Sequence, residues 1–280
     1  MARLHSDGAL ARRLEAADAR LCLEFVRILA RLRPASAAAA LPVAGGQAAY
    51  TGVGSPLTQA RGLGMSDPVG DADLDRLEEF YRARGVPAAI EVCPLAHPSL
   101  AERLGRRGYR VIEFSNTLVR PVAREERPAT PPGMTIERMA PADFDLWVRT
   151  ATLAFFEPDP VPPEYLAVFS LFPHMPETTL FLARIEGEPC GAAAVALTEG
   201  VAAFFGTATL GRFRGRGTHA ALLAARLAHA SAAGCDLAVM GALPGSASQR
   251  NAERAGFRVA YTRVQMSLDH RGGAGILLQY

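Results

Sequence analysis

The segment Arg212-Phe-Arg-Gly215-Arg-Gly217-Thr218 decides the fold of this 280-residue chain. It follows a run of β-branched and aromatic residues, Val201 to Leu210, and precedes a run rich in alanine and leucine, Ala220 to Ala233. The pattern predicts a strand, a basic turn containing glycine, and a helix whose first N–H groups point outward. Because these N–H groups and the positive end of the helix dipole favour an anion, we expect the turn to hold a phosphorylated cofactor.

Two other phosphate-binding patterns fit less well. The Walker pattern ends in Gly-Lys-Ser/Thr and uses its lysine to reach the outer phosphates, but this chain contains no lysine. The dinucleotide fingerprint G-x-G-x-x-A is matched by Gly215, Gly217 and Ala220, and Asp236 follows at a suitable distance. In that fingerprint, however, the acidic residue lies at the end of the second strand, whereas Asp236 lies before the predicted strand that begins at Leu237. A dinucleotide cofactor is therefore not favoured.

The remaining match is R-x-x-G-x-G followed at once by a long helix, which resembles the acyl-CoA signature of the GNAT acyltransferase superfamily. The order of the surrounding elements is similar too: strand 201–210, signature 212–217, helix 218–233, strand 236–241, helix 246–255, and a last strand opened by Gly256-Phe257. The resemblance implies an α/β (α+β) fold, with a mixed, mostly antiparallel sheet flanked by helices. It also implies that the amides of the turn bind the pyrophosphate of acetyl-CoA.

Composition and charge indicate a globular chain. With 49% hydrophobic and 21% charged residues, 280 residues suggest two domains. The 30 basic residues are all arginine, but the formal net charge is only +2, so no broad basic face predicts a nucleic-acid partner. No apolar run reaches the roughly 20 residues of a membrane span, and no leader peptide is recognisable, so we expect no membrane association and a cytoplasmic location.

The four cysteines are widely scattered, at Cys22, Cys93, Cys190 and Cys235. They form no C-x-x-C pair and have no histidine at the spacing that zinc requires. We therefore expect reduced packing residues and no metal site.

The chain divides near residues 124–133, where R-E-E-R-P-A-T-P-P-G combines charge, proline and glycine. We predict one domain over 1–123, a linker over 124–133 and an acyltransferase domain over 134–280. Further predicted elements are helices over 8–33, 141–155 and 163–172, strands over 135–139, 179–185 and 190–197, and a final strand over Leu277–Tyr280.

The end of the first domain repeats the order of the second, since Gly108-Tyr109 matches Gly256-Phe257 in kind. This weak repeat implies a tandem arrangement with a second GNAT-like lobe. Where that lobe should carry a signature, the chain reads G-L-G-M-S-D-P-V-G-D-A-D-L-D, and its aspartates would repel a phosphate: Asp67, Asp71, Asp73 and Asp75. We expect that this degenerate lobe does not bind CoA. It would support the catalytic lobe structurally or form one side of the acceptor site.

The resemblance also implies site residues. Three residues at the strand end would hold the acyl carbonyl and the pantetheine: Ala208, Thr209 and Leu210. The pyrophosphate would contact the turn itself, formed by Arg212, Phe213, Arg214, Gly215, Arg216, Gly217 and Thr218, the last of which could also cap the helix. Many relatives carry an asparagine eight residues before the glycine of the last strand and a tyrosine four before it, the tyrosine as general acid. Here these positions are Ser248, which can still hydrogen-bond, and Ala252, which cannot donate a proton.

The general acid and the general base therefore stay open. Tyr261, Ser248 and bound water are candidates to protonate the thiolate, although a strand tyrosine is more often a packing residue. On the acceptor side, Glu157 and Asp159 lie in the segment F-F-E-P-D-P, where a carboxylate could bind the incoming ammonium or take its proton through water. His174 and His219 are less favoured, because surface positions are commoner for such residues. We take Tyr261 and Glu157 as the predicted catalytic residues.

These observations predict an acetyl-CoA-dependent N-acetyltransferase that transfers acetyl to an amine, of a small molecule or a peptide, by direct attack in a ternary complex. One alternative is a non-catalytic CoA-binding regulatory or scaffold protein, which the missing tyrosine keeps open. Another is transfer of aminoacyl groups from charged tRNA, as some tandem relatives do, although the chain has no basic surface pattern to support it. The acceptor and the oligomeric state are not constrained by the sequence.

Overall fold

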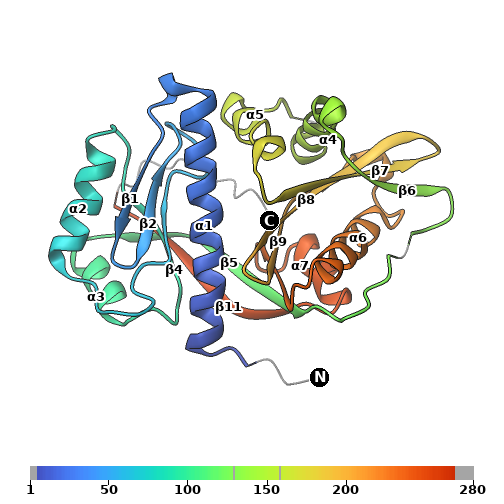
Figure 1. Ribbon diagram of the computed structural model, residues 1–280. Helices are drawn as coiled ribbons and strands as arrows, with labels where there is room; N and C mark the ends of the chain where they lie inside the picture. Colours follow the sequence, from blue (N-terminus) through green and yellow to red (C-terminus); the bar gives the residue numbers. More distant parts are fainter. Residues whose placement is uncertain (1–4, 129, 158, 269–280) are drawn as a thin grey trace. The chain divides into compact units, whose positions relative to one another are not determined.

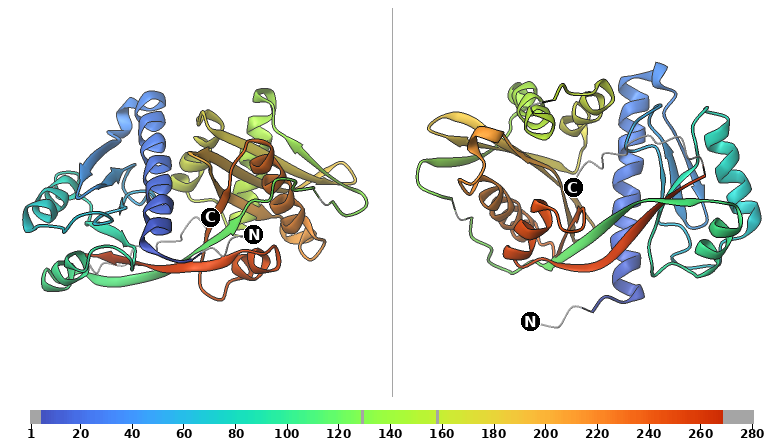
Figure 2. Two further views of the ribbon diagram at one scale, coloured as in Figure 1. Left: turned by 60° about the horizontal axis from the view of Figure 1, so that its bottom comes forward. Right: turned by 180° about the vertical axis from the view of Figure 1, so that it is seen from behind.

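A computed structural model describes residues 5–128, 130–157 and 159–268 (Figures 1 and 2). These residues form two compact units: unit 1 comprises 5–117 and 259–268, and unit 2 comprises 118–258. This division differs from the predicted domains 1–123 and 134–280, because the last described strand pairs within unit 1. The described residues of the predicted linker 124–133 form neither helix nor strand. The predicted strand Leu277–Tyr280 lies outside the described residues.

Unit 1 is a sheet with one long helix on one face and two shorter helices on the other (Figure 1). Its strands follow the order β1 (Ala39–Val43), β2 (Gly46–Tyr50), β3 (Ala60–Arg61), β4 (Ala89–Val92), β11 (Arg258–Ser267) and β5 (Arg110–Pro121), whose last residues belong to unit 2. Strands β3 and β4 are parallel, and β11 runs antiparallel to β4. The long helix is α1 (Gly8–Leu32), and the shorter ones are α2 (Asp71–Arg82) and α3 (Ser99–Arg106).

The two faces of the unit 1 sheet have different chemistry. On one face, apolar side chains including Leu74 and Leu77 of α2 pack with Ile90 of β4 in a hydrophobic core. The opposite face carries a polar cluster that is buried or nearly so and that we call the ion-pair cluster: Glu15 and Asp18 of α1, Arg61 of β3, Glu91 of β4, and Arg263 of β11. Such groups are rarely buried unless they pair with one another, so this cluster ties the last strand to the first helix.

In unit 2 the sheet again carries helices on both faces (Figure 2). Its strands follow the order β5 (its last residues), β10 (Leu237–Ala242), β9 (Val201–Thr209), β8 (Glu188–Thr198), β7 (Thr178–Ile185) and β6 (Met134–Arg138). Strands β6 to β9 form an antiparallel meander, whereas β9 and β10 are parallel. Helices α4 (Phe144–Phe156) and α5 (Pro163–Phe169) cover one face, and α6 (Thr218–Ala232) and α7 (Ala247–Arg254) cover the other. Single 3-10 turns occur at Pro34–Ser36, Pro141–Asp143, Phe172–His174 and Gly211–Phe213.

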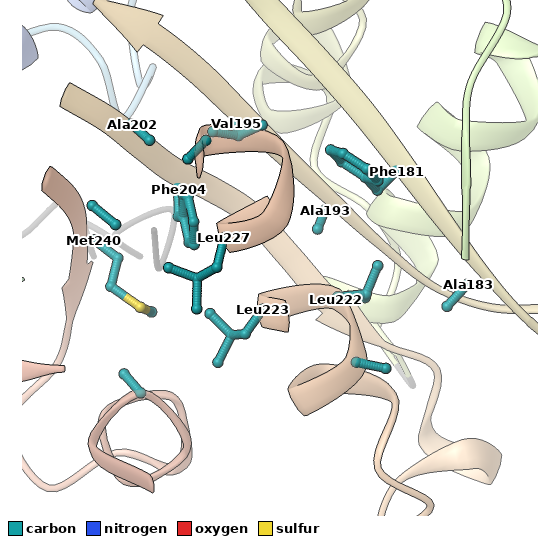
Figure 3. Close-up of a cluster of buried hydrophobic side chains, with 14 of the residues drawn as sticks. Phe181, Ala183, Ala193, Val195, Ala202, Phe204, Leu222, Leu223, Leu227 and Met240 are labelled. Carbon is teal, nitrogen blue, oxygen red and sulfur yellow. The ribbon is translucent and has the colours of Figure 1, made fainter. Parts of the chain in front are cut away.

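The core of unit 2 explains why α6 lies where it does. Its leucines at positions 222, 223 and 227 recur at helical spacing and pack against the sheet, with Phe204 of β9 and Met240 of β10 among their neighbours (Figure 3). On the other face of the sheet, the indole N–H of Trp147 in α4 donates to the carbonyl of Phe181 at 3.0 Å. The two layers fix the position of the segment that joins β9 to α6.

The predicted strand, turn and helix around residue 212 are confirmed, since β9 ends at Thr209 and α6 begins at Thr218. The predicted fold class, a mixed and mostly antiparallel α/β sheet flanked by helices, is also confirmed. The four cysteines are free and buried, as expected of packing residues. Within the described part of the chain, no helix is long and apolar enough to cross a membrane. The same residues contain no group of three or more His, Cys, Asp or Glu side chains placed to hold a metal ion.

Candidate functional site

The parallel strands β9 and β10 separate before they end. Their residue pairs run from Val201 and Leu237 to Phe204 and Met240, whereas β9 continues to Thr209 and β10 to Ala242. Beyond the last pair, the backbone of β9 is therefore free of the ladder with β10. This opening leaves backbone groups at the end of β9 available to a ligand.

A β-bulge lies in β9 at the same level. Ala194 pairs with Phe205 and Ala192 with Ala208, so Gly206 and Thr207 both oppose Ala193. Gly206 has φ +59°, and a Cβ there would lie 3.0 Å from the ring of Phe172. Only glycine has this φ without strain and leaves room for the Phe172 ring. The bulge at Gly206 bends the end of β9 before the following turn.

The turn itself leaves the start of α6 uncapped by any side chain. Gly217 is the N-cap residue, with φ +83°, and no side chain hydrogen-bonds at the cap. Thr218, which could have capped the helix, is instead buried with its hydroxyl 3.8 Å from Sγ of Cys190. The first N–H groups of α6 are thus available to an anion, as the sequence predicted.

The end of β9, the turn and residues of the three helices α4, α6 and α7 line a cavity of about 530 Å³. Eight of the predicted site residues line it: Ala208, Thr209, Phe213, Arg214, Gly215, Gly217, Thr218 and Ser248. The remaining lining residues were not predicted for this site: Ala154, Phe155, Thr207, His219, Ala220, Ala247 and Asn251. Ser248 and Asn251 come from α7, so the helix of the second sequence landmark does reach the site. Residues of α4 were missed because no local pattern relates them to a turn more than 50 residues away.

The arginines of the turn differ in their surroundings. Arg214 lines the cavity, and its Nε donates to the carbonyl of Thr209 at 3.3 Å. Arg212, at the motif position, is exposed and pairs with Glu188 at 2.9 Å. The guanidinium carbons of Arg212 and Arg216 lie 4.9 and 5.7 Å from the centroid of the Phe213 ring. Only Arg214 of the three lines the cavity, which makes it the arginine best placed to meet a ligand.

Leu210 and Glu157 lie beside the turn but do not line the cavity. The Leu210 N–H donates to the carbonyl of Cys190 at 3.0 Å. Glu157 follows α4, and its Oε2 accepts from the N–H of Gly211 at 2.9 Å, at an exposed position. The carboxylate is therefore held at the first residue of the turn, a position that the sequence alone could not specify.

Tyr261 is not among the residues that line the cavity. It belongs to β11 in unit 1, where its buried hydroxyl donates to Oε1 of Glu15 at 2.7 Å. Burial and the neighbouring Glu15 carboxylate raise the pKa of Tyr261 above its usual value. A phenol with a raised pKa is a poorer proton donor, so the environment of Tyr261 favours a role in packing over the predicted role as general acid.

We expect Tyr261→Phe to lower the free energy of unfolding by about 1–2 kcal/mol, because the Glu15 carboxylate loses a buried hydrogen bond. Turnover and its alkaline pH limb should not change. Chemical denaturation and a pH–rate profile measure the two effects separately. A variant of normal stability whose rate falls at high pH would restore Tyr261 to the mechanism.

The residues of the cavity fit the acyl-CoA that the signature implies. Two polar atoms lining it, Oγ1 of Thr209 and Nδ1 of His219, are buried and have no hydrogen-bond partner among the described residues. Buried polar atoms are normally satisfied, so these two are candidates to hydrogen-bond a ligand in the cavity. Together with the uncapped N-terminus of α6, they provide sites for both amides and phosphates.

The corresponding segment of unit 1 is closed by its own side chains. Before α2, the N–H of Val69 donates to Oγ of Ser99 at 2.8 Å, and the N–H of Gly70 donates to Oδ2 of Asp73 at 3.0 Å. Asp71, the first residue of α2, pairs with two arginines of the α3 region, Arg103 and Arg107. The first turn of this helix thus carries the carboxylates of Asp71 and Asp73, which favour the helix dipole and would repel a phosphate.

Comparison with known proteins agrees with this description. Residues 144–257 match the model of the "Acetyltransferase (GNAT) family". Among solved structures, a GCN5-related N-acetyltransferase from Kribbella flavida is 21% identical with a TM-score of 0.66, covering 91% of this chain and 96% of that one. A tandem GNAT protein from the clavulanic acid biosynthesis pathway is 16% identical with a TM-score of 0.59, covering 81% and 79% respectively. A search of curated proteins gave no match.

The strand opening, the bulge and the uncapped helix start all lie within the segment 144–257 that matches the GNAT family model. The resemblance drawn from the signature turn is therefore confirmed.

Proposed function

We propose that this chain is an acetyl-CoA-dependent N-acetyltransferase whose chemistry takes place in unit 2. The observation that carries the proposal is the single cavity that joins the end of β9 to the uncapped start of α6. Its turn residues, Arg214 to Thr218, would hold the pyrophosphate, and Thr207 to Thr209 would lie along the pantetheine arm. Acetyl-CoA, when bound, supplies an activated thioester.

Residues of this chain would then orient and polarise the reactants. Backbone groups of β9 beyond Phe204, which do not pair with β10, are available to hydrogen-bond the thioester and its carbonyl. The amine nitrogen attacks the carbonyl carbon and the C–S bond breaks, so one proton must leave the amine and one must reach the thiolate. We assign the first transfer to Glu157, acting directly or through water. We assign the second to a solvent water hydrogen-bonded to the Ser248 hydroxyl, which gives its proton to the thiolate and leaves hydroxide to solvent.

The acceptor in this proposal is an amine of a small molecule or a peptide. An exposed carboxylate such as Glu157, held in place by the Gly211 N–H, favours an approaching ammonium. Unit 1, where Asp71 and Asp73 in the first turn of α2 would repel a phosphate, would bind no CoA and would act as a structural partner of the catalytic unit.

Release of free thiol from acetyl-CoA in the presence of a panel of amines tests the proposal. We expect amine-dependent release, and Glu157→Gln should lower kcat/KM for the amine by about a hundredfold while affinity for acetyl-CoA is retained. Glu186→Gln, which changes an exposed glutamate of a hairpin, is the matched control and should leave the rate unchanged. Binding of acetyl-CoA without thiol release from any amine would favour the alternative of a non-catalytic CoA-binding protein.

A further inference from the structure

His219 is the second residue of α6, and its side chain lines the cavity. Its Nδ1 is inaccessible to solvent and has no hydrogen-bond partner among the described residues. The proposed function assigns no role to this side chain, and no sequence pattern distinguishes it from a surface histidine. An unsatisfied ring nitrogen in the wall of a ligand cavity requires an explanation.

The position of His219 on α6 sets the direction of its ring. Helical spacing places it above Leu222, Leu223 and Arg226, all of which are buried against the sheet. The ring therefore lies on the inner side of α6, toward the sheet, and not on the outer side that faces solvent. Thr209, whose Oγ1 is the other unsatisfied atom of the cavity, lies at the end of β9 on the same cavity wall.

The charge state of the ring limits what it can bind. Burial, with a further contribution from the Arg226 guanidinium, lowers the pKa of His219 to about 4. The positive end of the α6 dipole acts in the same direction. At neutral pH the ring is uncharged, so it carries one N–H donor and one nitrogen acceptor. It cannot serve as a general acid, since loss of a proton would leave an imidazolate.

We propose that His219 binds the pantetheine arm of the cofactor, with Nδ1 hydrogen-bonded to one of its amides. The inference rests on the proposed function. An amide offers both a donor and an acceptor and so suits a neutral imidazole in either tautomer. A phosphate offers acceptors only and would favour the imidazolium, which the surroundings of His219 oppose. His219 would therefore bind the pantetheine arm, whereas the turn and the N-terminus of α6 would bind the pyrophosphate.

Two probes distinguish these sites by calorimetry. Acetyl-CoA carries the arm, whereas adenosine 3′,5′-bisphosphate carries adenine and phosphates without it. We expect His219→Ala to weaken acetyl-CoA binding by about tenfold, because a buried hydrogen bond is lost, and to leave the affinity for the bisphosphate unchanged. His219→Gln, which keeps a donor and an acceptor, should recover most of the affinity for acetyl-CoA.

The same helix offers a matched control. His229 of α6 is hydrogen-bonded to Thr179 at 3.0 Å, packs against the ring of Phe181 and does not line the cavity, so His229→Ala should not alter either affinity. Unchanged acetyl-CoA affinity in His219→Ala would overturn the inference, and so would an equal loss for both probes. If the wild-type protein binds neither probe, it is the proposed function that fails, and this outcome is distinct from both.

Discussion

Replacing Gly217 by aspartate is expected to abolish acetyl-CoA binding, weakening it at least about a hundredfold. Gly217 is the N-cap of α6, and a Cβ at this residue would lie 3.1 Å from Cγ of Pro131. An aspartate at an N-cap accepts the first helical N–H groups itself, so the groups that would bind the pyrophosphate are taken. Its charge also repels the phosphates at close range. The loss of free N–H groups and the charge repulsion therefore both weaken binding of acetyl-CoA.

The fold should survive this change, because aspartate is a favoured N-cap residue and tolerates a positive φ better than most residues. Gly234, just beyond the C-terminal end of α6, has φ +77° and open space around its Cβ position, so Gly234→Asp is a matched control for strain and charge. It should bind acetyl-CoA normally. Gly217→Ala, which adds no charge, should lose less affinity than the aspartate variant. Retained affinity in Gly217→Asp, with the fold intact, would show that the turn is not the phosphate site.

The second large effect concerns unit 1. Replacing Arg263 by methionine is expected to lower the free energy of unfolding by about 3–5 kcal/mol, because it leaves the buried carboxylate of Glu15 without its arginine partner, whereas Asp18 and Glu91 keep Arg61. Nε of Arg263 lies 2.8 Å from Oε1 of Glu15, and its Nη1 lies 3.0 Å from Oδ2 of Asp18 and 3.3 Å from Oε2 of Glu91. Folded domains are stable by only about 5–15 kcal/mol, so the variant should lose much of its stability.

Thermal and urea unfolding measure this effect, and the midpoint should fall by roughly 10 °C. The control is Arg27→Met, which removes a charge from an exposed pair with Glu24 on α1 and should change stability by less than about 0.5 kcal/mol. If Arg263→Met were as stable as the control, the ion-pair cluster would not hold β11 to α1. Acetyl-CoA affinity, measured on whatever fraction stays folded, should be unaffected.

Local patterns were sufficient to predict the elements of unit 2. The change from the apolar strand run to helical spacing near Thr218, with glycines between, specified β9, the turn and α6 to within a few residues. The same logic found α1 from its apolar spacing. These features depend on residues that are close in the chain, which is why one sequence sufficed.

Features that depend on distant contacts could not be predicted. The pairing of β11 with β4 joins residues more than 150 positions apart, and no local pattern indicates which sheet a last strand will enter. The hydrogen bond from Tyr261 to Glu15 could not be predicted for the same reason, because the two residues lie at opposite ends of the chain. His219 was set aside for a similar reason, since its burial depends on the packing of α6 against the sheet.

The starts of α6 and α2 differ in the charges that would meet a phosphate. Both units have a helix that follows a glycine-containing segment, α6 in unit 2 and α2 in unit 1. In unit 2 the start of α6 carries no acidic residue and borders a cavity, whereas in unit 1 the first turn of α2 carries Asp71 and Asp73, whose charges oppose a phosphate. We therefore propose one cofactor site for each chain.

Calorimetric titration of the wild-type protein with acetyl-CoA, using NADH and ATP as controls, tests the central claim most directly because it needs no knowledge of the acceptor amine. We predict binding of one equivalent of acetyl-CoA, with no comparable binding of NADH or ATP. Two equivalents would contradict the closed site in unit 1. Absence of acetyl-CoA binding would contradict the account as a whole, since the turn from Arg212 to Thr218 would then hold no cofactor.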